Sequence, residues 1–392
     1  MSHRRQYAAA ATLLAIVIVA LSEGSLIGQE PERDSEAVCG ALRGLCMRDD
    51  VRFDRVGCQA YSLQCDVSVG TIGDSVTDEY QGFSNLAGLG WIEQLADRFD
   101  FGASESRLSV RGEPRQTGFA KNWARFGQAA LDIQWALLLP PGLSPRLDTI
   151  QPISVQVEGL RRQIEAGEID VAIVYVGHND AFIHWVTGGS FEGPEFDAFS
   201  QALVDRIADI VDTLRETGDV RLIVNLNSLA GPVVTGARSP SLRLAAQIVG
   251  PAMARHNEAL TAAMNERGIP VTDLIGNILV DSERYDSEAR MIRVGAHAID
   301  VDSIASVGDL LPAGHPLATG PCLSFGGSPW CSTPQYNLTF LVHDATHPTT
   351  VVQGLMANEF LEAIRQAFGF DLLPLSDDEI LRSAGISVAE TE

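Results

Sequence analysis

Four short segments of the chain carry groups that together could perform nucleophilic catalysis. They are the run Gly73-Asp74-Ser75 and residues 122–127, 177–180 and 344–347. A serine hydroxyl is a weak nucleophile until a base takes its proton, and the base works best when a carboxylate orients it. Donors that face the developing oxyanion complete such a site. Because the four segments contain a candidate for each part, the sequence predicts an acyl-transfer site.

Alternating strands and helices are predicted to position these segments. Residues 169–176 form an apolar run typical of a strand buried on both faces. Further strands are predicted at residues 67–72, 220–226 and 269–272, the first made less apolar by Ser68 and Thr71. Amphipathic helices are predicted at residues 153–164, 196–214, 241–267 and 352–368. This alternation predicts a parallel sheet with helices on both faces, and Ser75 and Asn179 follow the carboxyl ends of its strands, where sites of such sheets lie.

In order and spacing, the four segments resemble the sequence blocks of the SGNH (GDSL-type) hydrolases, a superfamily of serine esterases and lipases. The resemblance covers residues 67–368 and implies a three-layer α/β/α, flavodoxin-like fold. It implies Ser75 as the nucleophile, His347 as the base and Asp344 as the acid that orients the base. The implied oxyanion donors are the backbone N–H groups of Ser75 and Gly127 and the side-chain amide of Asn179, each worth roughly 3 kcal/mol in the transition state.

Each of these residues also has a purely structural interpretation. The alternatives are a turn residue at Ser75, a tightly packed glycine at Gly127, a loop-capping amide at Asn179, a helix N-cap at Asp344 and a surface imidazole at His347. A short motif alone is weak evidence, but four motifs in the expected order and context argue against coincidence.

Two other histidines, His178 and His343, are rival candidates for the base. His178 occupies a position of its segment that is free to vary in the family, and His343 points away from Asp344 if that segment is extended. We therefore expect neither to be the base, although His343 could line the pocket. Asp74 is expected to order the serine turn, and Asp180 to bond nearby backbone. No spacing of histidine, cysteine or carboxylate side chains indicates a metal site, so we expect neither metal nor cofactor.

The composition limits the partners of the protein. The 392 residues include 28 Lys and Arg against 51 Asp and Glu, which gives a formal net charge of −23, and Lys121 is the single lysine. Such a charge repels phosphate backbones and anionic membrane surfaces, so we expect no nucleic-acid binding and no strong binding to anionic membranes. The expected partner is an ester substrate, which is a small molecule, a lipid or a glycan. The oligomeric state is left open.

The N-terminus predicts export. Arg4 and Arg5 precede an apolar run at residues 8–21, which is shorter than the roughly 20 residues that span a bilayer. Residues 1–22 are therefore predicted to be a cleaved signal peptide, which places the protein in the periplasm or outside the cell. The alternative is an uncleaved signal-anchor that tethers the protein to the membrane.

Export makes disulfides the expected role of the six cysteines. They are Cys39, Cys46, Cys58, Cys65, Cys322 and Cys331. Six cysteines allow 15 connectivities, of which three local pairs are the simplest. The first four cysteines lie in a predicted N-terminal extension at residues 23–66. The hydrolase domain is predicted at residues 67–370, with a loop-rich insertion at about 276–335 that includes a strand at 291–301, and residues 371–392 are predicted to be a C-terminal tail.

The sequence thus favours an exported serine hydrolase that cleaves carboxylic esters through an acyl-enzyme, as lipases and esterases do. A carbohydrate O-acetylesterase of the cell envelope is an alternative within the same chemistry. A non-catalytic protein that binds glycans or lipids on the same fold is the alternative from another class. The acyl-chain length of the substrate is not determined by these residues.

Overall fold

The computed structural model describes residues 67–79, 87–96, 98–102, 119–131, 152–227, 240–325, 328–343, 346–370 and 372–388. The predicted signal peptide and N-terminal extension lie outside these residues, together with Cys39, Cys46, Cys58, Cys65 and Asp344. None of the helices in the described ranges combines the length and apolarity needed to cross a membrane.

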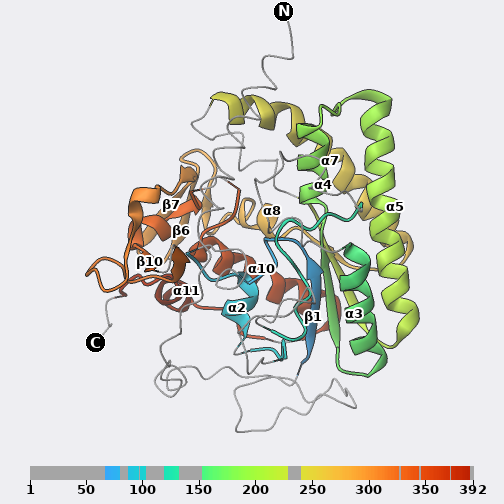
Figure 1. Ribbon diagram of the computed structural model, residues 1–392, viewed down its shortest axis with the longest axis horizontal. Coiled ribbons are helices and arrows are strands. Elements are labelled where there is room, and N and C mark those ends of the chain that lie inside the picture. Colours follow the sequence, from blue (N-terminus) through green and yellow to red (C-terminus); the bar gives the residue numbers. More distant parts are fainter. Residues whose placement is uncertain are drawn as a thin grey trace, which may run out of the picture.

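A parallel sheet of four strands lies at the centre of the molecule (Figure 1). In sheet order the strands are β1 (Val69–Gly73), β2 (Val171–Tyr175), β3 (Arg221–Asn225) and β4 (Val271–Thr272). Each was expected from an apolar run in the sequence. All five residues of β1 are buried, in spite of the polar Thr71. The Thr71 hydroxyl is satisfied there, because it donates to Asn122 Oδ1 at 2.5 Å.

Two segments without regular secondary structure run along the outer edge of β1. The Val69 N–H donates to Asp100 O at 3.0 Å, and the Thr71 N–H donates to Lys121 O at 3.0 Å. Further along, the Arg125 N–H donates to Gly73 O at 3.1 Å. These backbone bonds bring residues 119–128 alongside the end of the first strand, where Ser75 follows.

The two faces of the sheet are covered by separate layers of helices, because successive strand residues point to opposite sides. Val171, Ile173 and Tyr175 of β2 belong to one core cluster, and Ala172 and Val174 belong to the other. The first cluster includes side chains of α2 (Trp91–Leu95), α8 (Leu274–Ile278) and α10 (Thr350–Phe368). The second includes side chains of α3 (Ile153–Glu165), α5 (Gly193–Thr217) and α7 (Pro240–Glu266). The predicted three-layer α/β/α fold is therefore confirmed, with α3 and α5 to the right of the sheet and α2 and α10 to its left in Figure 1.

Residues 276–335 contain more strand than the sequence indicated. The expected strand at 291–301 is an antiparallel pair, β6 (Met291–Val294) and β7 (His297–Ile304). They belong to a sheet of order β11-β7-β6-β5, whose other members are β5 (Tyr285–Asp286) and β11 (Thr339–Leu341). A second small sheet has the order β8-β10-β9, from β8 (Leu310–Pro312), β9 (Cys322–Phe325) and β10 (Ser328–Ser332). Two short helices connect the two sheets along the chain: η3 (Val307–Asp309) follows β7, and α9 (Pro334–Asn337) follows β10.

One of the expected disulfides lies in this second sheet. Cys322 of β9 and Cys331 of β10 face each other across the strand pair and are joined by a disulfide. This confirms the local pairing of the last two cysteines.

Besides the short elements α2, α8, η3 and α9, two further helices in the described ranges were not expected from the sequence. The first, α4 (His178–Val186), follows β2 after Gly177. The second, α11 (Asp377–Ser383), lies within the segment interpreted as a tail, and the Ser376 hydroxyl caps it by accepting the Glu379 N–H at 3.2 Å. Ile380 of α11 is fully buried in the core cluster that includes α10. Both helices are short, so their apolar periodicity is hard to recognise.

Candidate active site

Ser75 lies in a tight turn directly after β1. The Thr77 and Asp78 N–H groups both donate to the Asp74 carbonyl, at 3.1 and 2.9 Å, and the Val76 N–H donates to Asp74 Oδ1 at 3.1 Å. Asp74 therefore orders the turn, as its position suggested. Only 7% of Ser75 is exposed.

His347 contacts Ser75 from a distant part of the sequence. Its Nε2 lies 2.7 Å from Ser75 Oγ, although 272 positions separate the two residues. The imidazole is buried, and the Phe126 ring stacks on it with centroids 6.0 Å apart and an interplanar angle of 27°. The Val342 N–H donates to His347 O at 2.8 Å, which closes the loop that leads from β11 to α10. Asp344, the expected orienting acid, lies outside the described residues.

The two rival histidines make other hydrogen bonds. His343 Nδ1 lies 2.8 Å from the Tyr336 hydroxyl. His178 is buried beside the serine turn, with Nδ1 3.1 Å from Asp74 Oδ2. The histidine that bonds to Ser75 Oγ is therefore His347.

Asn179 lies in the first turn of α4, next to the segment that contains Gly127. Its Nδ2 donates to Gln128 O at 2.8 Å. Gly127 itself has φ +77°, a backbone conformation that favours glycine. Gly177, which precedes α4, has φ +129°, and a Cβ there would lie 2.4 Å from Asn227 Nδ2. The start of α4 thus depends on a glycine, and it holds the Asn179 amide beside the Gly127 segment.

Asp180 ties the same helix to the residues that follow Gln128. Its two carboxylate oxygens accept the Ala130 and Leu131 N–H groups, each at 2.8 Å. Burial raises the pKa of Asp180 to about 6, and these two backbone hydrogen bonds oppose the rise. The expected bonding of Asp180 to nearby backbone is confirmed.

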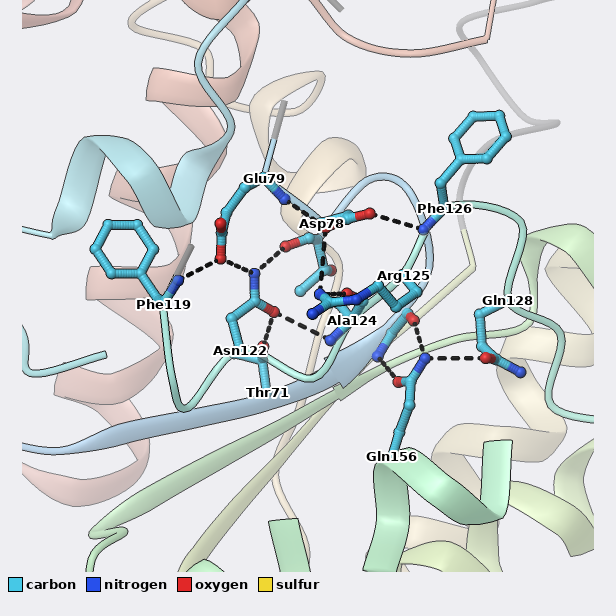
Figure 2. Close-up of polar contacts among 12 residues, drawn as sticks. Thr71, Asp78, Glu79, Phe119, Asn122, Ala124, Arg125, Phe126, Gln128 and Gln156 are labelled. Carbon is cyan, nitrogen blue, oxygen red and sulfur yellow. Dashed lines mark hydrogen bonds and ion pairs between the residues drawn. The ribbon is translucent and has the colours of Figure 1, made fainter. Parts of the chain in front are cut away.

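A buried polar cluster that the sequence did not indicate lies behind the serine turn. Figure 2 shows Asp78 and Glu79 bonded to residues 119–126, with Arg125 against Asp78. Burial raises the pKa of both carboxyl groups, and the charge of Asp78 adds to the rise that brings the pKa of Glu79 to about 8. From the sequence alone, the polar residues after Ser75 indicate a solvent-exposed turn, because nothing in the neighbouring sequence shows that residues 119–126 cover them. The closeness of Asp78 and Glu79 to the end of a buried strand was the available signal.

The structure thus brings Ser75 and His347 into contact and places Asn179 beside the segment of Gly127. Gln156 adds a further link: its Nε2 donates to Gln128 Oε1 at 3.0 Å and to Gly73 O at 3.2 Å. In the described part of the chain, no group of three or more His, Cys, Asp or Glu side chains is arranged to hold a metal ion. The chemistry available to this arrangement is nucleophilic attack by a serine hydroxyl with a histidine as its base.

Comparison with known proteins gives a family for this arrangement. The model of the GDSL-like lipase/acylhydrolase family matches residues 71–297, which is more than half of the chain. The match includes Ser75, Gly127 and Asn179 and ends before His347. No curated protein matches the chain.

Several solved structures are similar to the chain at low identity. One is a GDSL-like lipase from Bacteroides thetaiotaomicron, with 12% identity over 77% of this chain and 89% of that chain and a TM-score of 0.35. Another is an aryl esterase from M. smegmatis, with 12% identity, coverage of 54% and 85%, and a TM-score of 0.31. A carbohydrate acetylesterase from Sinorhizobium meliloti has 11% identity, coverage of 53% and 84%, and a TM-score of 0.31.

Proposed function

Because the chain belongs to the GDSL-like lipase/acylhydrolase family, we propose that it is an exported serine hydrolase that cleaves carboxylic esters through a covalent acyl-enzyme. The observation that carries the proposal is the 2.7 Å contact between Ser75 Oγ and His347 Nε2. Two residues so far apart in sequence meet at the carboxyl edge of the sheet in the geometry that proton transfer requires.

The first half-reaction acylates the serine. His347 Nε2 takes the proton of Ser75 as Oγ attacks the carbonyl carbon of the ester, and the carbonyl oxygen becomes an oxyanion. His347 then gives this proton to the departing alcohol oxygen, and the carbon–oxygen bond breaks to leave an acyl group on Ser75. In the second half-reaction His347 deprotonates a water molecule, which attacks the acyl carbonyl carbon. His347 then returns this proton to Ser75 Oγ as the carbon–oxygen bond to the serine breaks and the acid is released. Asp344 is proposed to fix the tautomer and orientation of the imidazole.

The oxyanion is proposed to accept hydrogen bonds from the backbone N–H groups of Ser75 and Gly127 and from the Asn179 amide. An amide nitrogen carries two hydrogens. Since Asn179 Nδ2 donates one of them to Gln128 O, the second is left for the oxyanion. The bond to Gln128 also fixes the direction of this donor before substrate arrives, which is the condition for strong electrostatic stabilisation.

Two observations support export. The N-terminal apolar run has the length and flanking arginines of a signal peptide. The Cys322–Cys331 disulfide is of a kind that persists in oxidising compartments and is rare in the cytosol.

The test is hydrolysis by protein that is produced from the full sequence in an oxidising compartment. Its substrates are p-nitrophenyl acetate, butyrate and palmitate together with an O-acetylated glycan, and Ser75→Ala is the control. We expect hydrolysis of at least one substrate by the parent and none above background by the variant. Preference for the acetylated glycan would identify the O-acetylesterase alternative. Absence of hydrolysis by both proteins on every substrate contradicts the proposal and favours the non-catalytic alternative.

A further inference from the structure

Asp78 lies three residues after Ser75, and only 3% of it is exposed. Each of its carboxylate oxygens accepts a backbone hydrogen bond: Oδ1 from the Glu79 N–H at 2.9 Å and Oδ2 from the Phe126 N–H at 2.8 Å (Figure 2). The Arg125 Nη1 lies 3.5 Å from Oδ1. A single buried carboxylate therefore joins the serine turn to the neighbouring segment at residues 124–128.

Phe126, the residue held by this bond, has two neighbours of functional interest. It directly precedes Gly127, whose N–H is a proposed oxyanion donor and whose φ of +77° lies in a region open mainly to glycine. Its ring stacks on the imidazole of His347, and Figure 2 shows the ring pointing away from the polar cluster. A bond that fixes the Phe126 backbone therefore influences both the direction of the Gly127 N–H and the position of the His347 imidazole.

The segment depends on this bond because it contains no helix or strand of its own. A further backbone bond ties the segment to the end of β1, where the Arg125 N–H donates to Gly73 O at 3.1 Å. A carboxylate suits the position of Asp78 because both of its oxygens are acceptors. An asparagine has one acceptor oxygen, so its amide nitrogen would face either the Glu79 N–H or the Phe126 N–H, donor against donor.

Glu79, the adjacent buried acid, provides a matched contrast. Its Oε1 accepts the Phe119 N–H at 2.8 Å and Asn122 Nδ2 at 3.1 Å. Its pKa of about 8, raised by burial and by the charge of Asp78, leaves it protonated at neutral pH. A glutamine can therefore keep both bonds and the charge state.

We propose that Asp78 is a positioning residue for ester hydrolysis, which acts through the Phe126 N–H to aim the Gly127 oxyanion donor and to seat the Phe126 ring against His347. This inference rests on the proposed function of Ser75 and His347. Asp78 itself contacts neither the substrate nor the reacting atoms and acts through Phe126.

The test compares Asp78→Asn with Glu79→Gln in the full-length exported protein. The measurements are kcat and KM for p-nitrophenyl butyrate and the inhibition constant of butylboronic acid, whose tetrahedral adduct on Ser75 uses the oxyanion donors. Loss of one oxyanion donor lowers kcat by about 10²–10³-fold, so a misaimed donor in Asp78→Asn is expected to lower kcat by roughly 10–100-fold. We expect KM to change by less than about threefold, boronate affinity to fall in parallel with kcat, and Glu79→Gln to stay within about twofold of the parent.

A folded Asp78→Asn protein with parental kcat and boronate affinity would overturn the inference, as would an equal loss in Glu79→Gln. If Asp78→Asn does not fold, Arg125→Gln takes its place, because it removes the cation that faces the Asp78 carboxylate. It is expected to lower kcat by about threefold or more at unchanged KM, and a parental kcat would overturn the inference. The proposed function fails separately: then the parent itself shows no hydrolysis that depends on Ser75.

Discussion

The nucleophile and the base of the candidate site are held by two different kinds of structure. Ser75, Gly127 and Asn179 lie on segments that leave the parallel sheet or run along its edge, and polar side chains join these segments to one another. His347 follows β11, whose partner strand β7 belongs to a second sheet formed by residues 285–341. The oxyanion side of the site is thus built on the parallel sheet, whereas the side that carries the base follows a strand of this second sheet. Substitutions on the two sides should therefore differ in their effects.

The largest losses of kcat are expected when Ser75 or His347 is replaced, because the two sides of the site meet at these residues. Ser75→Ala and His347→Ala should each lower kcat by about 10⁴-fold or more, because residues that act as one unit fail together. For the same reason the double variant should be no worse than either single variant. Steady-state hydrolysis of p-nitrophenyl butyrate measures all three. A further large loss in the double variant would show that the two groups act separately.

A smaller effect is expected on the oxyanion side alone. Asn179→Ala removes one proposed donor and the bond to Gln128 O, and it should lower kcat by about 10²–10³-fold. Fluorophosphonate labelling of Ser75 should continue at a reduced rate, because Ser75 and His347 remain in contact. A kcat within threefold of the parent would remove Asn179 from the oxyanion hole.

Outside the parallel sheet, loss of the disulfide should affect stability more than chemistry. Replacing Cys322 and Cys331 together by serine opens a short loop, and it should lower the free energy of unfolding by about 2–3 kcal/mol. We expect kcat to stay within about twofold, because β10 belongs to the sheet that does not contain β11. Thermal melting and kinetics at 25 °C check both parts. A tenfold fall in kcat of the folded variant would show that this sheet also positions His347.

The substitution with the smallest expected effect on kcat, Glu79→Gln, should instead change the pH dependence of stability. Folding raises the pKa of Glu79 from the ordinary 4.5 to about 8, so between these values the folded state keeps a proton that the unfolded state releases. Stability is therefore lost as the pH rises through this window, with a slope of at most about 1.4 kcal/mol per pH unit from this group. Glu79→Gln should make the fall of the melting temperature between pH 5 and 8 less steep. Asp180 and Glu359, with raised pKa values of about 6 and 7, should preserve part of the fall in the variant. An unchanged slope would show that Glu79 titrates normally.

The same contrast explains what could be predicted from the sequence. The run at 169–176 and the helical periodicity at 196–214 indicated β2 and α5 because each element is long or apolar enough to show its period. The strands of the two smaller sheets have two to eight residues, and pairing between strands that are distant in sequence, such as β7 and β11, determines them. Their local pattern was therefore too short to separate them from loops.

The candidate site divides in a similar way. Ser75, Gly127, Asn179 and His347 were identified because each lies in a recognisable motif, and the motifs of Ser75, Asn179 and His347 also follow a predicted strand or precede a predicted helix. The burial of Asp78 and Glu79 was not predicted, since it depends on Phe119 and Phe126, which lie 40 or more positions further along the chain. The local sequence shows neither that Phe119 and Phe126 contact these two acids nor that burial raises the pKa of Glu79.

The central claim, that Ser75 is the nucleophile and His347 its base, is tested most directly by covalent labelling. A fluorophosphonate would be reacted with the parent and with His347→Ala, and the adduct located by mass spectrometry of the digested protein. We expect one adduct, on Ser75, and a labelling rate at least about 100-fold lower in the variant. An adduct on another residue, or an equal rate in the two proteins, would contradict it.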